Sequence, residues 1–166
     1  IASEMVSEPL VVAADLSERD AVERIAAAVL GEFGGLDVLV NNAGYAVKGS
    51  FLEADWATHA DFIAVMTTSW LHLTHLFLPA MVRRGRGRVL NVSSLASLAP
   101  EPAGSLYAPV KSMMTSASRA LRLDLLGTGV HVTALCPGFT YTEFHDVLGV
   151  REEMKKLPKY MWQEAR

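Results

Sequence analysis

Apolar residues occur along the chain in short runs and in longer, helix-spaced stripes. The short runs predict four β-strands, at residues 9–14, 36–40, 88–93 and 130–135. The stripes, in which apolar residues recur every three or four positions, predict helices at residues 17–33, 58–84 and 106–126. Strands therefore alternate with amphipathic helices from one end of the pattern to the other.

Residues that favour helix ends support these boundaries. Ser17 and Asp20 have the spacing of a capping box, which predicts the start of the first helix. Gly34 follows its last apolar position and predicts its end. Pro109 falls in the first turn of the last helix, where a missing N–H has no cost.

This alternation predicts an α/β fold with a doubly wound, parallel, Rossmann-like sheet that helices cover on both faces. With 166 residues the chain suits one domain, residues 1–166. Beyond residue 138 the pattern weakens into a loop and a mixed segment. Residues 139–166 are either a lid over an apolar substrate or a segment packed on the core.

Composition narrows the class of protein. A 51% hydrophobic content and a formal net charge of −3 suit a globular protein and give no sign of a nucleic-acid partner. No apolar run is long enough for a membrane span. The single cysteine, Cys136, favours a reducing compartment, so we expect a cytoplasmic protein. His72 and His75 have a spacing that zinc could use, but surface histidines are far more common, and we predict no metal site.

Tyr107, Lys111 and Ser94 carry the strongest indication of chemistry. Tyr107 and Lys111 stand four residues apart on a predicted helix, so they share a face. A lysine ammonium beside a phenol favours its ionised form, which a free phenol with a pKa of about 10 rarely adopts at neutral pH. Ser94 ends a predicted strand and could hold a substrate oxygen against that phenol.

Five motifs in register extend this pattern over nearly the whole chain. They are Asp15-Leu16, residues 41–44 (Asn-Asn-Ala-Gly), Ser94, residues 107–111 (Tyr-Ala-Pro-Val-Lys) and residues 137–142 (Pro-Gly-Phe-Thr-Tyr-Thr). In order and spacing the chain resembles the short-chain dehydrogenase/reductase family. The resemblance implies a Rossmann-like oxidoreductase that uses NAD or NADP.

The resemblance implies a role for each catalytic candidate. Tyr107 would give a proton to a carbonyl oxygen during reduction, or take one from an alcohol during oxidation. Lys111 would lower the pKa of Tyr107 and bind the nicotinamide ribose. Ser94 would position the substrate oxygen.

The resemblance also implies the residues that bind the cofactor. Tyr107 and Lys111 are among them, at the nicotinamide ribose. Asp15 and Leu16 would contact the adenine ring. The others follow two strands and are Asn42, Ala43, Gly44, Pro137, Gly138, Thr140 and Thr142.

The chain departs from the family pattern at two places. Met66 stands where the family has a catalytic asparagine, and a thioether cannot organise the water that relays protons to the lysine. We expect Met66→Asn to keep or raise activity, unless the methionine serves packing. The glycine-rich turn that binds the pyrophosphate does not occur in these residues. We therefore expect a sheet that is incomplete at the N-terminus, and a longer polypeptide that continues before Ile1 and after Arg166.

We expect hydride transfer between nicotinamide and a small-molecule secondary alcohol or ketone, with apolar bulk. The alternative is a non-catalytic binding or scaffold protein that has kept the fold. In the family, the two long helices commonly form a subunit contact, which implies a homodimer or homotetramer. The sequence does not decide between NAD and NADP.

Overall fold

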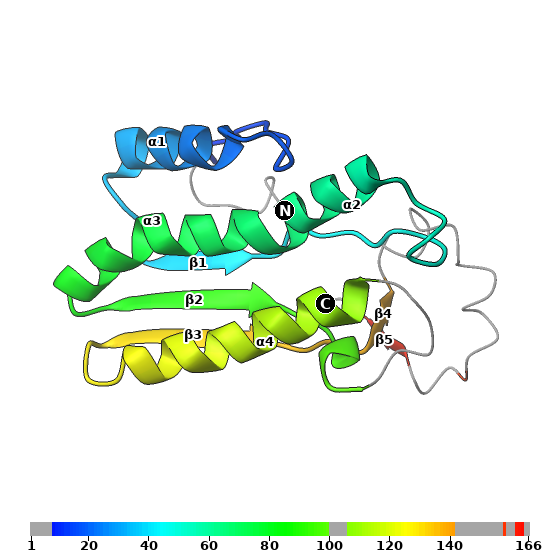
Figure 1. Cartoon of the computed structure of the whole chain (residues 1–166). Helices are drawn as coiled ribbons and strands as arrows, with labels where there is room; N and C mark the ends of the chain where they lie inside the picture. The colour runs from blue at the N-terminus through cyan, green and yellow to red at the C-terminus, as the bar shows by residue number, and fades with distance from the viewer. Residues whose placement is uncertain (1–7, 100–105, 142–157, 159–161, 165–166) are drawn as a thin grey trace.

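A three-stranded parallel sheet forms the centre of the molecule (Figure 1). The computed structural model describes residues 8–99, 106–141, 158 and 162–164. The central strand is β2 (Gly87–Val92), with β1 (Val38–Asn41) on one side and β3 (Val130–Leu135) on the other. All three strands run in the same direction, so their carboxyl ends meet at one edge. The predicted parallel, Rossmann-like sheet is confirmed.

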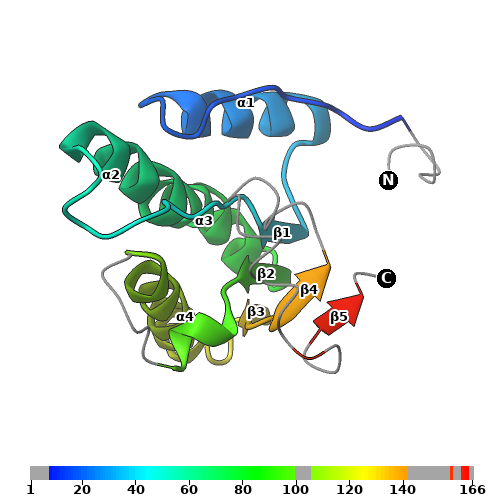
Figure 2. The same ribbon diagram turned by 90° about the vertical axis from the view of Figure 1, so that its right-hand side faces the viewer.

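Two long helices cover one face of this sheet. α3 (Ser69–Arg83) and α4 (Tyr107–Asp124) lie on the same side of the strands, as Figure 2 shows. α1 (Ala21–Phe33) packs against α3. Beyond the carboxyl edge, β4 (Phe139–Tyr141) and β5 (Trp162–Glu164) form a separate two-stranded parallel sheet.

The core lies between the sheet and the helices. Phe77 and Met81 of α3 are 2% and 0% exposed and pack on Val89 of β2. The rest of this buried cluster is Ala26, Leu39, Leu125, Val130 and Val132. β2 is central because it pairs with a strand on each side, and both α3 and α4 contact it.

The predicted strand at residues 9–14 is wrong. The segment has no strand partner, and Val11 is 80% exposed. β1 pairs with β2 on one side only, and its Val38 and Val40 are more than half exposed. An extended segment becomes a strand only when a neighbouring strand pairs with its backbone. Among the described residues, no strand pairs with residues 9–14.

The predicted capping box is also wrong, whereas the helix end is confirmed. Asp20 occupies the N-cap of α1 without a side-chain cap. Ser17 instead donates from its N–H and its hydroxyl to the Asp15 carboxylate, at 2.9 and 2.8 Å. Gly34 has a left-handed φ of 67°, and its N–H donates to the Leu30 carbonyl at 2.9 Å.

The long helix predicted at residues 58–84 has three parts. α2 (Trp56–Ile63) begins after Asp55, whose side chain accepts the Thr58 N–H at 2.8 Å. A π-helical segment, η2 (Ala64–Thr68), then joins α2 to α3. A wider turn of this kind leaves backbone groups without their usual partners and recurs at functional sites.

No helix in the described part of the chain is both long and apolar enough to pass through a membrane.

Phe77→Ala tests the position of the core. Phe77 is 2% exposed, so its loss should lower the free energy of unfolding by about 3–5 kcal/mol. Phe33→Ala is the matched control, because Phe33 is 59% exposed, and it should change that energy by only about 0.5 kcal/mol. Urea unfolding followed by circular dichroism measures both, and equal losses would contradict the described packing.

Candidate active site

The carboxyl edge of the sheet gathers most of the residues that the sequence singled out. β1 leads into residues 42–44, β2 leads into Ser94, and β3 leads into Pro137 and Gly138. α4 begins at the same edge with Tyr107, close to the arrowhead of β2 in Figure 1. The three parallel strands and the start of α4 therefore bring four motifs, distant in sequence, to one edge of the sheet.

Lys111 forms the centre of this site. Its side chain is buried, with 5% of the residue exposed, and its Nζ donates to the Val92 carbonyl at the end of β2, at 2.7 Å. Nζ also lies 5.7 Å from the centroid of the Tyr107 ring. The predicted pairing of these two side chains on one helix face is present. Burial lowers the pKa of Lys111 from 10.5 to about 8, because the interior disfavours the charged form.

Hydroxyl groups fasten the end of β2 to α4. The Ser93 hydroxyl donates to the Lys111 carbonyl at 2.9 Å and lies 2.8 Å from the Thr115 hydroxyl. Ser94, the next residue, is half-buried, and its hydroxyl accepts the Ala96 N–H at 3.1 Å. Ser94 thus directly follows Val92 and Ser93, the two residues that hydrogen-bond to Lys111.

The segment after β1 approaches Lys111 closely. Asn42, Ala43 and Gly44 are exposed at this edge. A Cβ on Gly44 would lie 3.7 Å from Lys111 Nζ and 3.1 Å from Met66 Sδ. A side chain at this position would crowd the Met66 sulfur, whereas its distance to the lysine would be an ordinary contact.

The segment after β3 packs beside Ser94. The Pro137 carbonyl accepts the Leu95 N–H at 2.9 Å, and a Cβ on Gly138 would lie 3.2 Å from the Leu95 side chain. The Thr140 hydroxyl donates to the Gly138 carbonyl at 3.2 Å. Thr142, and most of the proposed lid at residues 139–166, lie outside the described residues.

Asp15 and Leu16 belong to the loop before α1. Ser17 lowers the pKa of Asp15 through its backbone N–H first and its hydroxyl second. Burial is the main cause that raises the pKa of Tyr45, and the carboxylates of Asp61 and Asp15 add to it.

The sequence motif at residues 41–44 includes Asn41, but sequence reasoning missed its buried polar partners. Asn41 Nδ2 donates to Asn91 Oδ1 at 2.7 Å, and Asn91 Nδ2 donates to the Ser118 hydroxyl at 2.9 Å. This network links β1, β2 and α4 behind the site. Ser93 and Thr115 were missed as well, because isolated hydroxyls have no characteristic spacing.

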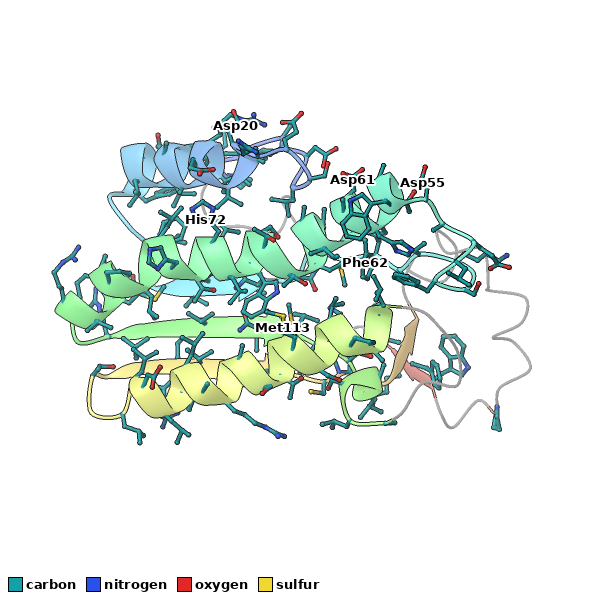
Figure 3. The ribbon with its side chains drawn as sticks, in the orientation of Figure 1. Asp20, Asp55, Asp61, Phe62, His72 and Met113 are labelled. Carbon is teal, nitrogen blue, oxygen red and sulfur yellow. The ribbon has the colours of Figure 1, made fainter. Side chains whose placement is uncertain are left out.

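The described residues contain no group of three histidine, cysteine or acidic side chains placed to hold a metal ion. His72, labelled in Figure 3, lies 3.8 Å from the Glu23 carboxylate on α1.

Comparison with known proteins agrees with this geometry. The family model for short chain dehydrogenases matches residues 2–153. The chain belongs to the short-chain dehydrogenase family. Among curated relatives, a serine 3-dehydrogenase of Agrobacterium fabrum is 37% identical over 137 residues, which cover 80% of this chain and 53% of the relative. The NADP-dependent 3-hydroxy acid dehydrogenase YdfG of Escherichia coli is 36% identical over 140 residues, covering 80% of this chain and 54% of the relative.

Solved structures of the family have the same fold. A short-chain dehydrogenase from Sphingobium yanoikuyae in complex with NADPH has a TM-score of 0.80 and 30% identity, over 90% of this chain and 57% of that one. A putative NAD(P) dependent gluconate 5-dehydrogenase from Beutenbergia cavernae has a TM-score of 0.82 and 26% identity, over 96% of this chain and 66% of that one. The chain spans about half the length of the curated relatives that it matches.

The buried lysine predicts a pH dependence of stability. Between about pH 8 and pH 10.5 the unfolded chain keeps a proton on Lys111 that the folded chain has released. A rise in pH through this range should therefore favour folding, by up to about 3 kcal/mol. Lys111→Met should lack this contribution. The free energies of unfolding of the unsubstituted protein and of Lys111→Met are measured in urea from pH 7 to pH 10. Their difference isolates the contribution of Lys111 from that of other titrating groups. A difference that stays constant with pH would contradict the burial of the ammonium.

Proposed function

We propose that this protein is an NAD(P)-dependent oxidoreductase that moves a hydride between nicotinamide and a secondary alcohol or ketone. The observation that carries the proposal is the buried Lys111 ammonium, 5.7 Å from the Tyr107 ring, at the carboxyl edge of a parallel sheet. Ligands of open α/β sheets bind at that edge. Relatives that are NADP-dependent or bound to NADPH support the choice of cofactor.

The residues present fit the nicotinamide end of such a cofactor. The exposed backbone at residues 42–44 allows a ligand to approach closely, since Gly44 has no side chain. Lys111 would bind ribose hydroxyls, and Pro137, Gly138 and Thr140 would face the carboxamide. Asp15 and Leu16 would contact the adenine. When bound, the cofactor supplies or accepts the hydride, which no side chain can do.

The chain's own groups would handle the proton and the substrate oxygen. In reduction, Tyr107 Oη gives its proton to the carbonyl oxygen while Ser94 Oγ donates a hydrogen bond to that oxygen. The phenolate that remains is stabilised by the Lys111 ammonium, and a proton from solvent restores the phenol. In oxidation the same proton moves from the alcohol to the phenolate.

The substrate class is proposed at the level of a secondary alcohol or ketone. The proposed apolar character of the substrate is based on Phe139 and Trp162. The centroids of their rings lie 5.8 Å apart in the small sheet after β3. Two relatives carry names that specify serine and 3-hydroxy acids, so a polar hydroxy acid is the competing substrate. An assay that includes both kinds of compound decides between them.

Tyr107→Phe tests the proposal in the whole protein that carries these residues. NADH or NADPH oxidation is followed with apolar ketones and with 3-oxo acids. Loss of the phenolic proton should lower kcat/KM by at least about 100-fold and leave the dissociation constant of the cofactor nearly unchanged. Met113→Leu, an exposed position on the same helix (Figure 3), is the control and should retain activity.

Turnover that survives Tyr107→Phe would overturn the acid/base role. Absence of nicotinamide binding and turnover in the unsubstituted protein would favour the alternative, a scaffold that has kept the fold. The predicted homodimer or homotetramer stays a prediction, which sedimentation of the same sample tests.

A further inference from the structure

Met66 lies where the segment after β1 meets the helices. It is 1% exposed, and its Sδ accepts the Tyr45 N–H at 3.3 Å. The Tyr45 ring also packs edge to face on Phe62, one turn before Met66, with centroids 5.4 Å apart (Phe62 is labelled in Figure 3). Two contacts of Tyr45 therefore fasten the end of this segment to α2 and η2.

The same thioether and the Lys111 ammonium lie beside one glycine, Gly44. A Cβ on Gly44 would lie 3.1 Å from Met66 Sδ and 3.7 Å from Lys111 Nζ, so both side chains border this glycine. The other groups that face Nζ are the Val92 carbonyl of β2 and the Tyr107 ring of its own helix. Among the described residues, no carboxylate lies within 4.0 Å of Nζ.

The π-helical segment determines where Met66 stands. Its carbonyl accepts the indole N–H of Trp70 at 3.0 Å, and Trp70 is 3% exposed. The Ser69 hydroxyl donates to the Val65 carbonyl at 2.6 Å in the same turn. Side chains thus satisfy the backbone groups that the wide turn leaves over, and they hold η2 in place.

We propose that Met66 is a positioning residue with two separable effects. Its sulfur holds residues 42–45 above the lysine, and its apolar bulk keeps water from the Lys111 ammonium. The catalytic meaning of this arrangement rests on the proposed function. The arrangement itself can be tested without an activity assay.

Met66→Leu separates the two effects, because leucine keeps the bulk and removes the acceptor. The Tyr45 amide should exchange with solvent at least about threefold faster, as expected for one lost hydrogen bond. Lys111 should keep its low pKa, measured from the pH dependence of its acetylation by mass spectrometry. Met81→Leu is the matched control, since Met81 is also a fully buried methionine, and it should change neither value.

Met66→Gln should give the opposite pattern. Glutamine has a similar length and a carbonyl oxygen that can accept the Tyr45 N–H, so amide exchange should stay slow. The polar amide beside the ammonium should move the pKa of Lys111 from about 8 towards 10.5. In the whole protein, a pH profile of kcat/KM governed by Lys111 should move in the same direction.

Either of two results would overturn the proposal: unchanged Tyr45 exchange in Met66→Leu, or an unchanged Lys111 titration in Met66→Gln. If Met66→Leu does not fold, the Lys111 titration in Met66→Gln decides alone. Failure of the proposed function appears differently, as absent nicotinamide turnover in the unsubstituted protein while the exchange and titration results stand.

Discussion

The hydrogen bond from Lys111 Nζ to the Val92 carbonyl connects the fold to the chemistry of the site. It joins α4 to the end of β2 at 2.7 Å, and it holds an ammonium in a place that is 5% exposed. A buried cation without a carboxylate partner is costly, which is why its pKa falls to about 8. A group that gains or loses its charge so near neutral pH suits a site that moves protons.

The structure behind Lys111 maintains this contact. The Ser93 hydroxyl holds the Lys111 backbone, and the Asn41–Asn91–Ser118 network joins the strands to α4 at their buried side. Both amide groups donate in this network, while Asn41 Oδ1 is buried without a hydrogen-bond partner among the described residues. The contacts that are made join the strands to α4 directly behind the exposed segment at residues 42–44.

Local sequence pattern predicted the elements whose hydrogen-bond partners are present in the described fold. β3 occupies residues 130–135, as its apolar run indicated, and Gly34 ends α1 through its own left-handed conformation. The run at residues 9–14 has the same composition as a strand, but pairing depends on a neighbour that sequence pattern does not specify. The π segment was missed because one widened turn shifts the apolar stripe too little to change its period.

The candidate site was predictable to the extent that its residues have a fixed spacing. Tyr107 and Lys111 share a helix face, and this places Lys111 Nζ 5.7 Å from the centroid of the Tyr107 ring. The burial of Lys111 was not predictable, because it depends on residues of other elements, such as Val92 of β2, whose carbonyl accepts the Nζ hydrogen bond. Single buried hydroxyls such as Ser93 resemble many surface serines in sequence and differ from them only in their surroundings.

The pKa of Lys111 is the most direct test of this account. Carbon-13 NMR of the chain with labelled lysine side chains follows every ammonium group, and Lys111→Met assigns the resonance. One lysine, Lys111, should titrate near pH 8, well below the ordinary pKa of 10.5. A Lys111 resonance that titrates above about pH 10 would contradict it, because the ammonium would then be hydrated or paired.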